Sequence, residues 1–326
     1  MFDLLPSSSP PGSSHYISDK LIIAKRIALG FEDPVRIQWT KWGKGNPFFD
    51  WQERHELRTV KVMQLRKEQK APFFHEYVTF KLNDGTCFRI DRRQVPDEDS
   101  PMSCTKEQGV EAYDTLEQVS CLDDSTYSVS DCLIELSFEY PVSVVGVTTI
   151  CYWISRHSKA HIYTLQKYNC YFYAQTIVLL TSCDWDGDDI WWTNDSHKAN
   201  LRSLHNWEVT ERQRGSRPAK ALDPAQPSGT LQLPTELAQR LKARVKAVLH
   251  GRERPQSTQQ GHNMNDLREY VAAMIQAHSI RVAQYKFLLR YDAGEVERDI
   301  KTVMNDLSHV MKGFMWDLGI HSNHNY

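Results

Sequence analysis

The residues with the clearest chemical potential are a cysteine at the expected start of a buried helix and the asparagine before it. Asn169 and Cys170 precede the apolar run of residues 171–181, whose length and Ala, Gln and Leu content predict a helix. Asn is a preferred N-cap residue, so Cys170 falls in the first helical turn. Backbone N–H groups without partners and the positive end of the helix dipole favour a thiolate there. The same N–H groups can receive the oxyanion of a tetrahedral intermediate, which predicts a nucleophile and its oxyanion hole at one place.

A nucleophilic thiol needs an imidazole within hydrogen-bonding reach and a third group that orients the imidazole. His75 starts a predicted hairpin whose turn is Asn83-Asp84-Gly85, because Gly85 tolerates the positive φ of a three-residue turn with a bulge. Counting outward from that turn places Asp91 on the same sheet face as His75, diagonally adjacent to it. A two-residue turn would place Asp91 on the opposite face. Arg89 and Arg93 are the other polar residues that the three-residue register brings to the His75 face.

The order of these motifs resembles that of the circularly permuted papain-like thiol enzymes. The resemblance rests on His-Glu-Tyr-Val at residues 75–78, Arg-Ile-Asp at 89–91 and Asn-Cys opening the helix, and it covers residues 57–182. That clan includes the lecithin retinol acyltransferase-like proteins, the PPPDE peptidases and the permuted NlpC-type hydrolases. The resemblance implies that Cys170 is the nucleophile, His75 the general base that later acts as acid, and Asp91 the residue that orients the imidazole. The chain departs from the acyltransferase group in its aromatic residues 171–173, which argues against lipid substrates.

An α+β fold follows from the extended segments and the apolar helix, and the resemblance implies a permuted papain-like core with an antiparallel sheet packed on the Cys-bearing helix. We expect an N-terminal extension with a short helix in residues 1–50 and the α+β domain in residues 51–210. A Pro-, Ser- and Gly-containing linker is predicted at 211–233, before a helical region at 234–326. The apolar run of residues 142–154 fits either a strand or a buried helix.

Composition excludes several classes of protein. The 326 residues carry 39 basic and 41 acidic side chains, with a net charge of −2, so general nucleic-acid binding is not expected. No apolar stretch approaches the roughly 20 residues that span a bilayer, and the first residues lack the pattern of a secretory signal. We therefore expect an intracellular, cytoplasmic protein without a transmembrane segment.

The sequence also gives no sign of a metal or cofactor. The seven cysteines are spread along the chain without a C-x-x-C pair, which argues against a disulfide framework and a zinc ribbon. The acidic segment 184–194 has its glycine, Gly187, at the fourth rather than the sixth place of a calcium loop. H-E-x-x-H, phosphate-loop and G-x-S-x-G motifs do not occur, so no cofactor is expected.

The expected activity is thiol-dependent hydrolysis or acyl transfer on an amide, ester or thioester, with an acyl or peptide substrate that the sequence does not specify. The alternative is a non-catalytic papain-like scaffold that binds a protein partner through its C-terminal helices. His278 lies on the apolar face of one of those helices, a position more typical of a buried histidine with its hydrogen bonds satisfied than of a ligand.

Overall fold

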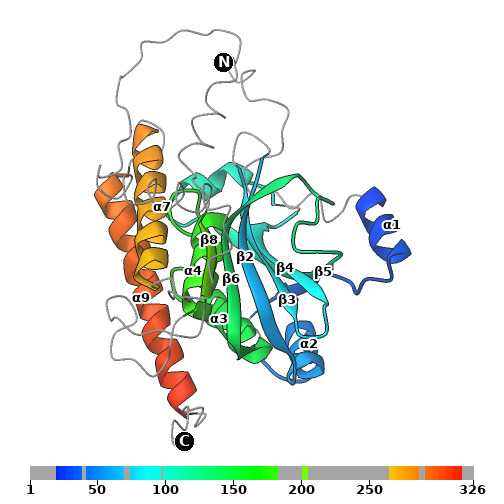
Figure 1. Ribbon diagram of the computed structural model, residues 1–326. Helices are drawn as coiled ribbons and strands as arrows, with labels where there is room; N and C mark the ends of the chain where they lie inside the picture. The colour runs from blue at the N-terminus through cyan, green and yellow to red at the C-terminus, as the bar shows by residue number, and fades with distance from the viewer. Residues whose placement is uncertain are drawn as a thin grey trace, which may run out of the picture.

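The computed structural model describes residues 20–38, 42–69, 74–96, 98–182, 200–204, 264–285 and 291–317. Within these residues the chain forms an antiparallel sheet with helices packed on it (Figure 1), which confirms the expected α+β class. The predicted linker at 211–233 and the acidic segment at 184–194 lie outside the described residues. Among the described helices, none combines the length and the apolar character needed to cross a membrane.

Eight strands make up the sheet, and each pair of neighbours is antiparallel. The order across the sheet is β1-β5-β4-β3-β2-β6-β8, with β7 beside β5. The strands are β1 (Val35–Ile37), β2 (Thr59–Glu68), β3 (Glu76–Leu82), β4 (Cys87–Gln94), β5 (Val110–Val119), β6 (Ser130–Ser143), β7 (Ile162–Tyr163) and β8 (Asn200–Leu204). The side chains of β3 and β4 are buried on both faces of the sheet, with Lys81 as the exception.

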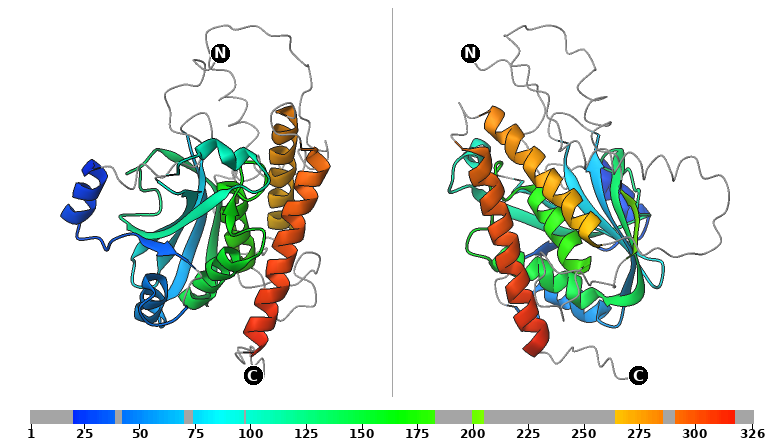
Figure 2. Two further views of the ribbon diagram at one scale, coloured as in Figure 1. Left: turned by 180° about the vertical axis from the view of Figure 1, so that it is seen from behind. Right: turned by 60° about the vertical axis from the view of Figure 1, so that its left-hand side comes forward.

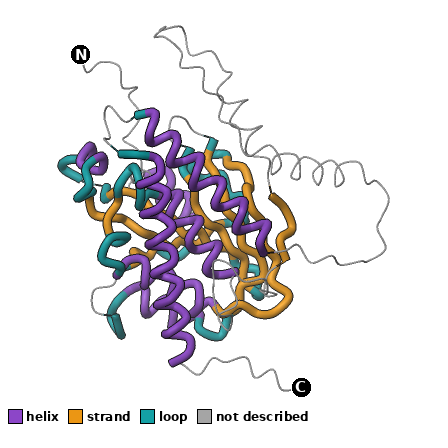
Figure 3. The backbone as a smooth tube through the Cα atoms, turned by 90° about the vertical axis from the view of Figure 1, so that its left-hand side faces the viewer, coloured by secondary structure: helices purple, strands orange, loops and turns teal. Residues whose placement is uncertain are grey.

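The helices of the described chain lie mainly on one face of this sheet. They are α1 (Lys20–Ala28), α2 (Pro47–His55), α3 (Val144–Arg156), α4 (Cys170–Ser182), α7 (Met264–Gln284) and α9 (Ala293–Asp317), with one short 3₁₀ helix, η2 (Pro101–Thr105). Helices α3 and α4 pack on the strands, and α7 and α9 cover α3 and α4 from outside (Figure 2). Viewed from the side of α7 and α9, helices stand in front of strands (Figure 3). Every α4 residue except Tyr171 is buried as a result.

The β3–β4 hairpin has the register expected from a three-residue turn. The N–H of Leu82 donates to the carbonyl of Thr86 at 2.9 Å, and Gly85 takes a φ of +91°. Val78 pairs with Ile90 in the ladder. Side chains alternate between faces along each strand, so Asp91 lies on the face opposite to that of its neighbour Ile90.

The apolar run of residues 142–154, which fitted either a strand or a buried helix, contains the end of strand β6 and most of helix α3. Strand β6 ends at Ser143, whose hydroxyl accepts a hydrogen bond from the N–H of Val145 at 3.2 Å and so caps α3. The helical part, residues 144–154, contains only buried and partly buried side chains, which weakens the periodicity that separates the two structures in a sequence.

One hydrophobic core includes side chains from both ends of the described chain. Ile37 of β1 belongs to it, so the segment expected as an N-terminal extension supplies an edge strand. Val271 of α7 and Val303 of α9 belong to the same core as Phe80 and Ile177. The C-terminal helices therefore contribute to the stability of the sheet and of α4, since they bury the outer face of the helix layer.

Candidate active site

Cys170 opens α4, as the sequence predicts, and Asn169 caps the helix. The side-chain oxygen of Asn169 accepts a hydrogen bond from the N–H of Phe172 at 3.2 Å, and its backbone carbonyl accepts from the N–H of Tyr173 at 3.1 Å. The amide of Cys170 comes before both of these donors in the chain. Cys170 is therefore placed in the first helical turn, where the helix dipole favours a negative charge.

His75 lies directly before the first residue of β3, and Asp91 lies on β4. The ring Nε2 of His75 is hydrogen-bonded to Oδ1 of Asp91. The contact confirms that the hairpin brings the two side chains together. Phe74, immediately before His75, has a φ of +44°, which is an uncommon and strained value for a residue other than glycine. The backbone thus turns sharply where the histidine is presented.

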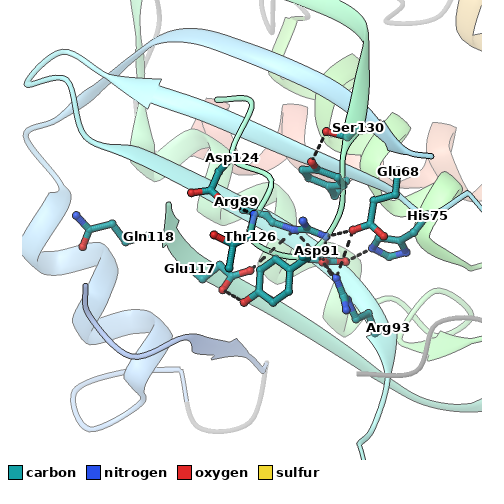
Figure 4. Close-up of polar contacts among 12 residues, drawn as sticks. Glu68, His75, Arg89, Asp91, Arg93, Glu117, Gln118, Asp124, Thr126 and Ser130 are labelled. Carbon is teal, nitrogen blue, oxygen red and sulfur yellow. Dashed lines mark hydrogen bonds and ion pairs between the residues drawn. The ribbon is translucent and has the colours of Figure 1, made fainter. Parts of the chain in front are cut away.

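Two arginines hold the other oxygen of Asp91. Arg89 donates from Nε at 3.0 Å and Nη2 at 2.6 Å to Oδ2, and Arg93 donates from Nε at 3.0 Å and Nη2 at 2.7 Å. Figure 4 shows the three side chains and His75 gathered on one face of the hairpin. Burial alone would raise the pKa of Asp91, but Arg93, His75 and Arg89 hold it well below its usual range. Asp91 is therefore a buried, permanently ionised partner for the imidazole.

The same cluster contains a second carboxylate. Glu68, on β2, accepts a hydrogen bond from Nη2 of Arg89 at 2.9 Å. Burial opposes ionisation of Glu68, yet Arg89, His75 and Arg93 lower its pKa. The guanidinium of Arg89 also stacks 3.5 Å from the ring centroid of Tyr77. These contacts fix the arginines, which in turn fix Asp91.

The imidazole of His75 lies between Asp91 and Cys170. Burial by itself would lower the pKa of His75, but the charge of Asp91 and then of Cys170, with a hydrogen bond to each, raises it to about 10. Because Nε2 is used by Asp91, Nδ1 is the ring nitrogen left for the thiol. The site thus combines a thiol, an imidazole and an ionised orienting group.

The other described cysteines are in different environments. Burial raises the pKa of Cys104 and of Cys132 to about 11 and that of Cys151 to about 12. Burial also raises the pKa of Cys87. Cys121 is exposed. Cys170, by contrast, acts on the imidazole of His75.

Metal ligation does not explain the cluster. Within the described residues, no group of three or more His, Cys, Asp and Glu side chains is arranged to hold a metal ion.

No model of a known protein family, no curated protein and no solved structure matches this chain.

Sequence reasoning named Cys170, His75 and Asp91, and the structure brings these three together. It did not identify Glu68 as part of the cluster. The alternation Arg-x-Asp-x-Arg at residues 89–93 was the available signal for the two arginines, because such spacing in a strand places all three side chains on one face. For Glu68, at the end of β2, no comparable signal exists.

Proposed function

We propose that this protein is a thiol-dependent hydrolase or acyltransferase. The observation that carries the proposal is the position of His75, which is hydrogen-bonded to the ionised Asp91 and interacts with Cys170 at the start of a helix. Nucleophilic catalysis at a carbonyl by a thiol requires an imidazole beside the thiol and a group, here a carboxylate, that orients the imidazole.

In the first half of the reaction, Sγ of Cys170 attacks the carbonyl carbon of an ester, thioester or amide. A C–S bond forms, and the carbonyl electrons move to the oxygen, which the N–H of Cys170 stabilises. The tetrahedral intermediate then collapses as the bond to the leaving group breaks. His75, as the imidazolium, gives its proton to that leaving group, and an acyl-enzyme remains.

In the second half, water or another acceptor attacks the acyl-enzyme. Neutral His75 takes the proton of the attacking group and so becomes the imidazolium again. The C–S bond breaks and the thiolate of Cys170 is restored. Asp91 keeps its charge throughout, because Arg89 and Arg93 stabilise the ionised form. No cofactor takes part in these steps.

The fold that we propose is a permuted papain-like core. Its support is the chain order, in which the histidine of the first hairpin strand and the carboxylate of the second precede the cysteine that opens the buried helix. A reducing compartment such as the cytoplasm agrees with this chemistry, since the thiol must stay reduced, and all six described cysteines are free.

Acylation by an activated ester tests the proposal without knowledge of the natural substrate. The full chain is mixed with 4-nitrophenyl acetate at pH 7, nitrophenolate release is followed, and the acetylated peptide is identified by mass spectrometry. We expect acetylation at Cys170 in the parent protein and its loss in Cys170→Ala and His75→Ala. The exposed Cys121 supplies the matched control, so Cys121→Ser is expected to react like the parent.

The opposite outcome favours the non-catalytic alternative. If Cys170 is acetylated no faster than Cys121, and His75→Ala changes nothing, the catalytic proposal fails and a scaffold that binds a partner becomes the better explanation. In the C-terminal helices, Val271, Val296 and Val303 are buried in the protein's own core. A partner that binds these helices would therefore contact their other faces.

A further inference from the structure

The turn that leads into the catalytic helix, residues 164–169, is held by few contacts of its own. The hydroxyl of Thr164 accepts the N–H groups of Lys167 at 3.3 Å and Tyr168 at 3.0 Å. The side-chain amide of Asn169 donates to the carbonyl of Leu165 at 2.8 Å. These bonds curl the turn upon itself. The position of the turn relative to the rest of the protein depends on contacts to other elements. Two bonds to η2 hold it on one side: the N–H of Leu165 donates to the carbonyl of Cys104 at 2.9 Å, and the side-chain amide of Gln166 donates to the carbonyl of Thr105. The C-terminal helices supply further contacts.

A histidine from α7 supplies one of these contacts. Nε2 of His278 lies 2.8 Å from the carbonyl oxygen of Gln166 and 3.3 Å from Nδ2 of Asn169. A carbonyl oxygen only accepts, so Nε2 carries the proton and donates to Gln166. Burial, together with the nearby Arg281, lowers the pKa of His278 to about 3. The ring is therefore neutral at ordinary pH, and its single donor is directed at the turn.

Helix α9 supplies a second contact, to the next residue of the turn. Nζ of Lys167 forms an ion pair with Asp299 and lies 3.6 Å from Oε1 of Glu295. The side chain of Lys167 is only 8% exposed, and its ammonium group lies 4.6 Å from the ring centroid of Tyr291. The lysine of this pair is shielded from water and Asp299 is partly exposed, so the pair restrains the turn more strongly than a fully exposed one would.

We propose that the two C-terminal helices position the catalytic cysteine, with His278 of α7 and Asp299 of α9 as positioning residues that hold the turn before Cys170. The inference rests on the proposed function. Helices α7 and α9 thereby help to set the distance between Sγ of Cys170 and the ring of His75. Small displacements of a reacting group have large effects, since a shift of about 1 Å can cost about 10²-fold in rate.

Iodoacetamide labelling of the full chain, combined with hydrogen exchange, tests this role. In His278→Leu, which removes the donor to Gln166, we expect Cys170 to be labelled about tenfold more slowly at pH 7. Backbone amides of residues 168–173 should exchange faster. His278→Gln keeps an N–H donor and should recover most of both properties. Asp299→Asn should act in the same direction as His278→Leu, though less strongly.

Matched controls separate positioning from general destabilisation. Ser279→Ala removes an equally buried polar group of α7 that bonds only within its own helix, at 2.9 Å to the carbonyl of Ile275. Glu297→Gln removes an acid of α9 that pairs with Lys301. Both variants should label Cys170 at the parent rate. If His278→Leu fails to fold, Asp299→Asn decides between positioning and destabilisation, because the Asp299 side chain is 28% exposed in the parent and its replacement leaves the core intact.

The outcomes distinguish this inference from the proposed function. A parent protein with a reactive Cys170, together with His278 and Asp299 variants that match it in labelling and exchange, would overturn the positioning role alone. An unreactive Cys170 in the parent would overturn the proposed function. In that case faster exchange at residues 168–173 in the variants would still show that the C-terminal helices hold the start of α4, and unchanged exchange would show that they do not.

Discussion

Asp91 shares its two carboxylate oxygens between different tasks: Oδ1 is hydrogen-bonded to Nε2 of His75, and Oδ2 accepts four hydrogen bonds from Arg89 and Arg93. The arginines keep the carboxylate ionised although it is buried. An ionised, immobile Asp91 fixes which ring nitrogen of His75 faces Cys170 and stabilises the imidazolium. The hairpin face is thus a rigid support for the imidazole.

Replacing Asp91 with asparagine should affect both stability and reactivity. Asp91→Asn leaves two buried guanidinium groups without their anionic partner, and breaking a buried ion pair in this way costs about 3–5 kcal/mol. Urea denaturation measures the loss. Labelling of Cys170 should also slow, because the imidazolium loses its counter-charge. The exposed Asp123 gives the control, so Asp123→Asn should leave both properties unchanged. Equal stabilities of the two variants would contradict the role assigned to Asp91.

The titration of His75 reports the influence of Cys170 directly. In the parent protein the pKa of His75 is raised to about 10 by Asp91 and Cys170, which outweigh burial. In Cys170→Ala one of these two attractions is removed, so the pKa should fall below that of the parent. It should stay above the ordinary value of about 6.5, since Asp91 remains. NMR titration of the His75 ring proton measures both values, and identical titration curves would show that the thiol and imidazole do not interact.

Stability should depend on pH through the same histidine. The folded pKa of His75, about 10, exceeds the unfolded value of 6.5, so the folded state binds the proton more tightly. The stabilisation is complete below pH 6.5 and is lost as the pH rises toward 10. The difference in unfolding free energy between the parent and His75→Gln should therefore shrink by roughly 2–4 kcal/mol over this range. Urea denaturation of both proteins at several pH values checks the slope, and a difference that grows with pH would refute it.

Local chemistry explains how much of this site the sequence could predict. The register of the hairpin follows from Gly85, because a positive φ there closes a three-residue turn, and that register decides the face of Asp91. The cap of α4 follows from Asn169. Both depend on residues close together in the sequence, for which propensity and turn chemistry are informative.

Contacts between elements that are distant in the sequence could not be predicted from local propensity and turn chemistry. Arg89 is only 2% exposed, although a charged residue in a strand ordinarily indicates a solvent-facing side, so its burial could not be predicted from the residue type. The donation from His278 to Gln166 depends on how α7 packs on α4. No periodic pattern encodes that packing, and the sequence predicted only that His278 would be buried with its hydrogen bonds satisfied.

Gly109 offers a test of the packing around the turn that precedes Cys170. It has a φ of +61°, and a Cβ added to it would lie 2.5 Å from the backbone oxygen of Tyr163. Gly109→Ala therefore combines backbone strain with a clash against the backbone of β7, which pairs with β5. Gly45 has a φ of +92° with open space around it, so Gly45→Ala measures strain alone, about 1–2 kcal/mol.

We expect Gly109→Ala to lower the unfolding free energy by more than Gly45→Ala, with urea denaturation as the measurement. The clash displaces Tyr163, which lies close enough to Cys170 for burial and then the charge of Cys170 to raise the pKa of the tyrosine. Labelling of Cys170 should consequently slow in Gly109→Ala and stay at the parent rate in Gly45→Ala. Equal losses of stability, with unchanged labelling in both variants, would mean that β7 and the following turn shift without disturbing the cysteine.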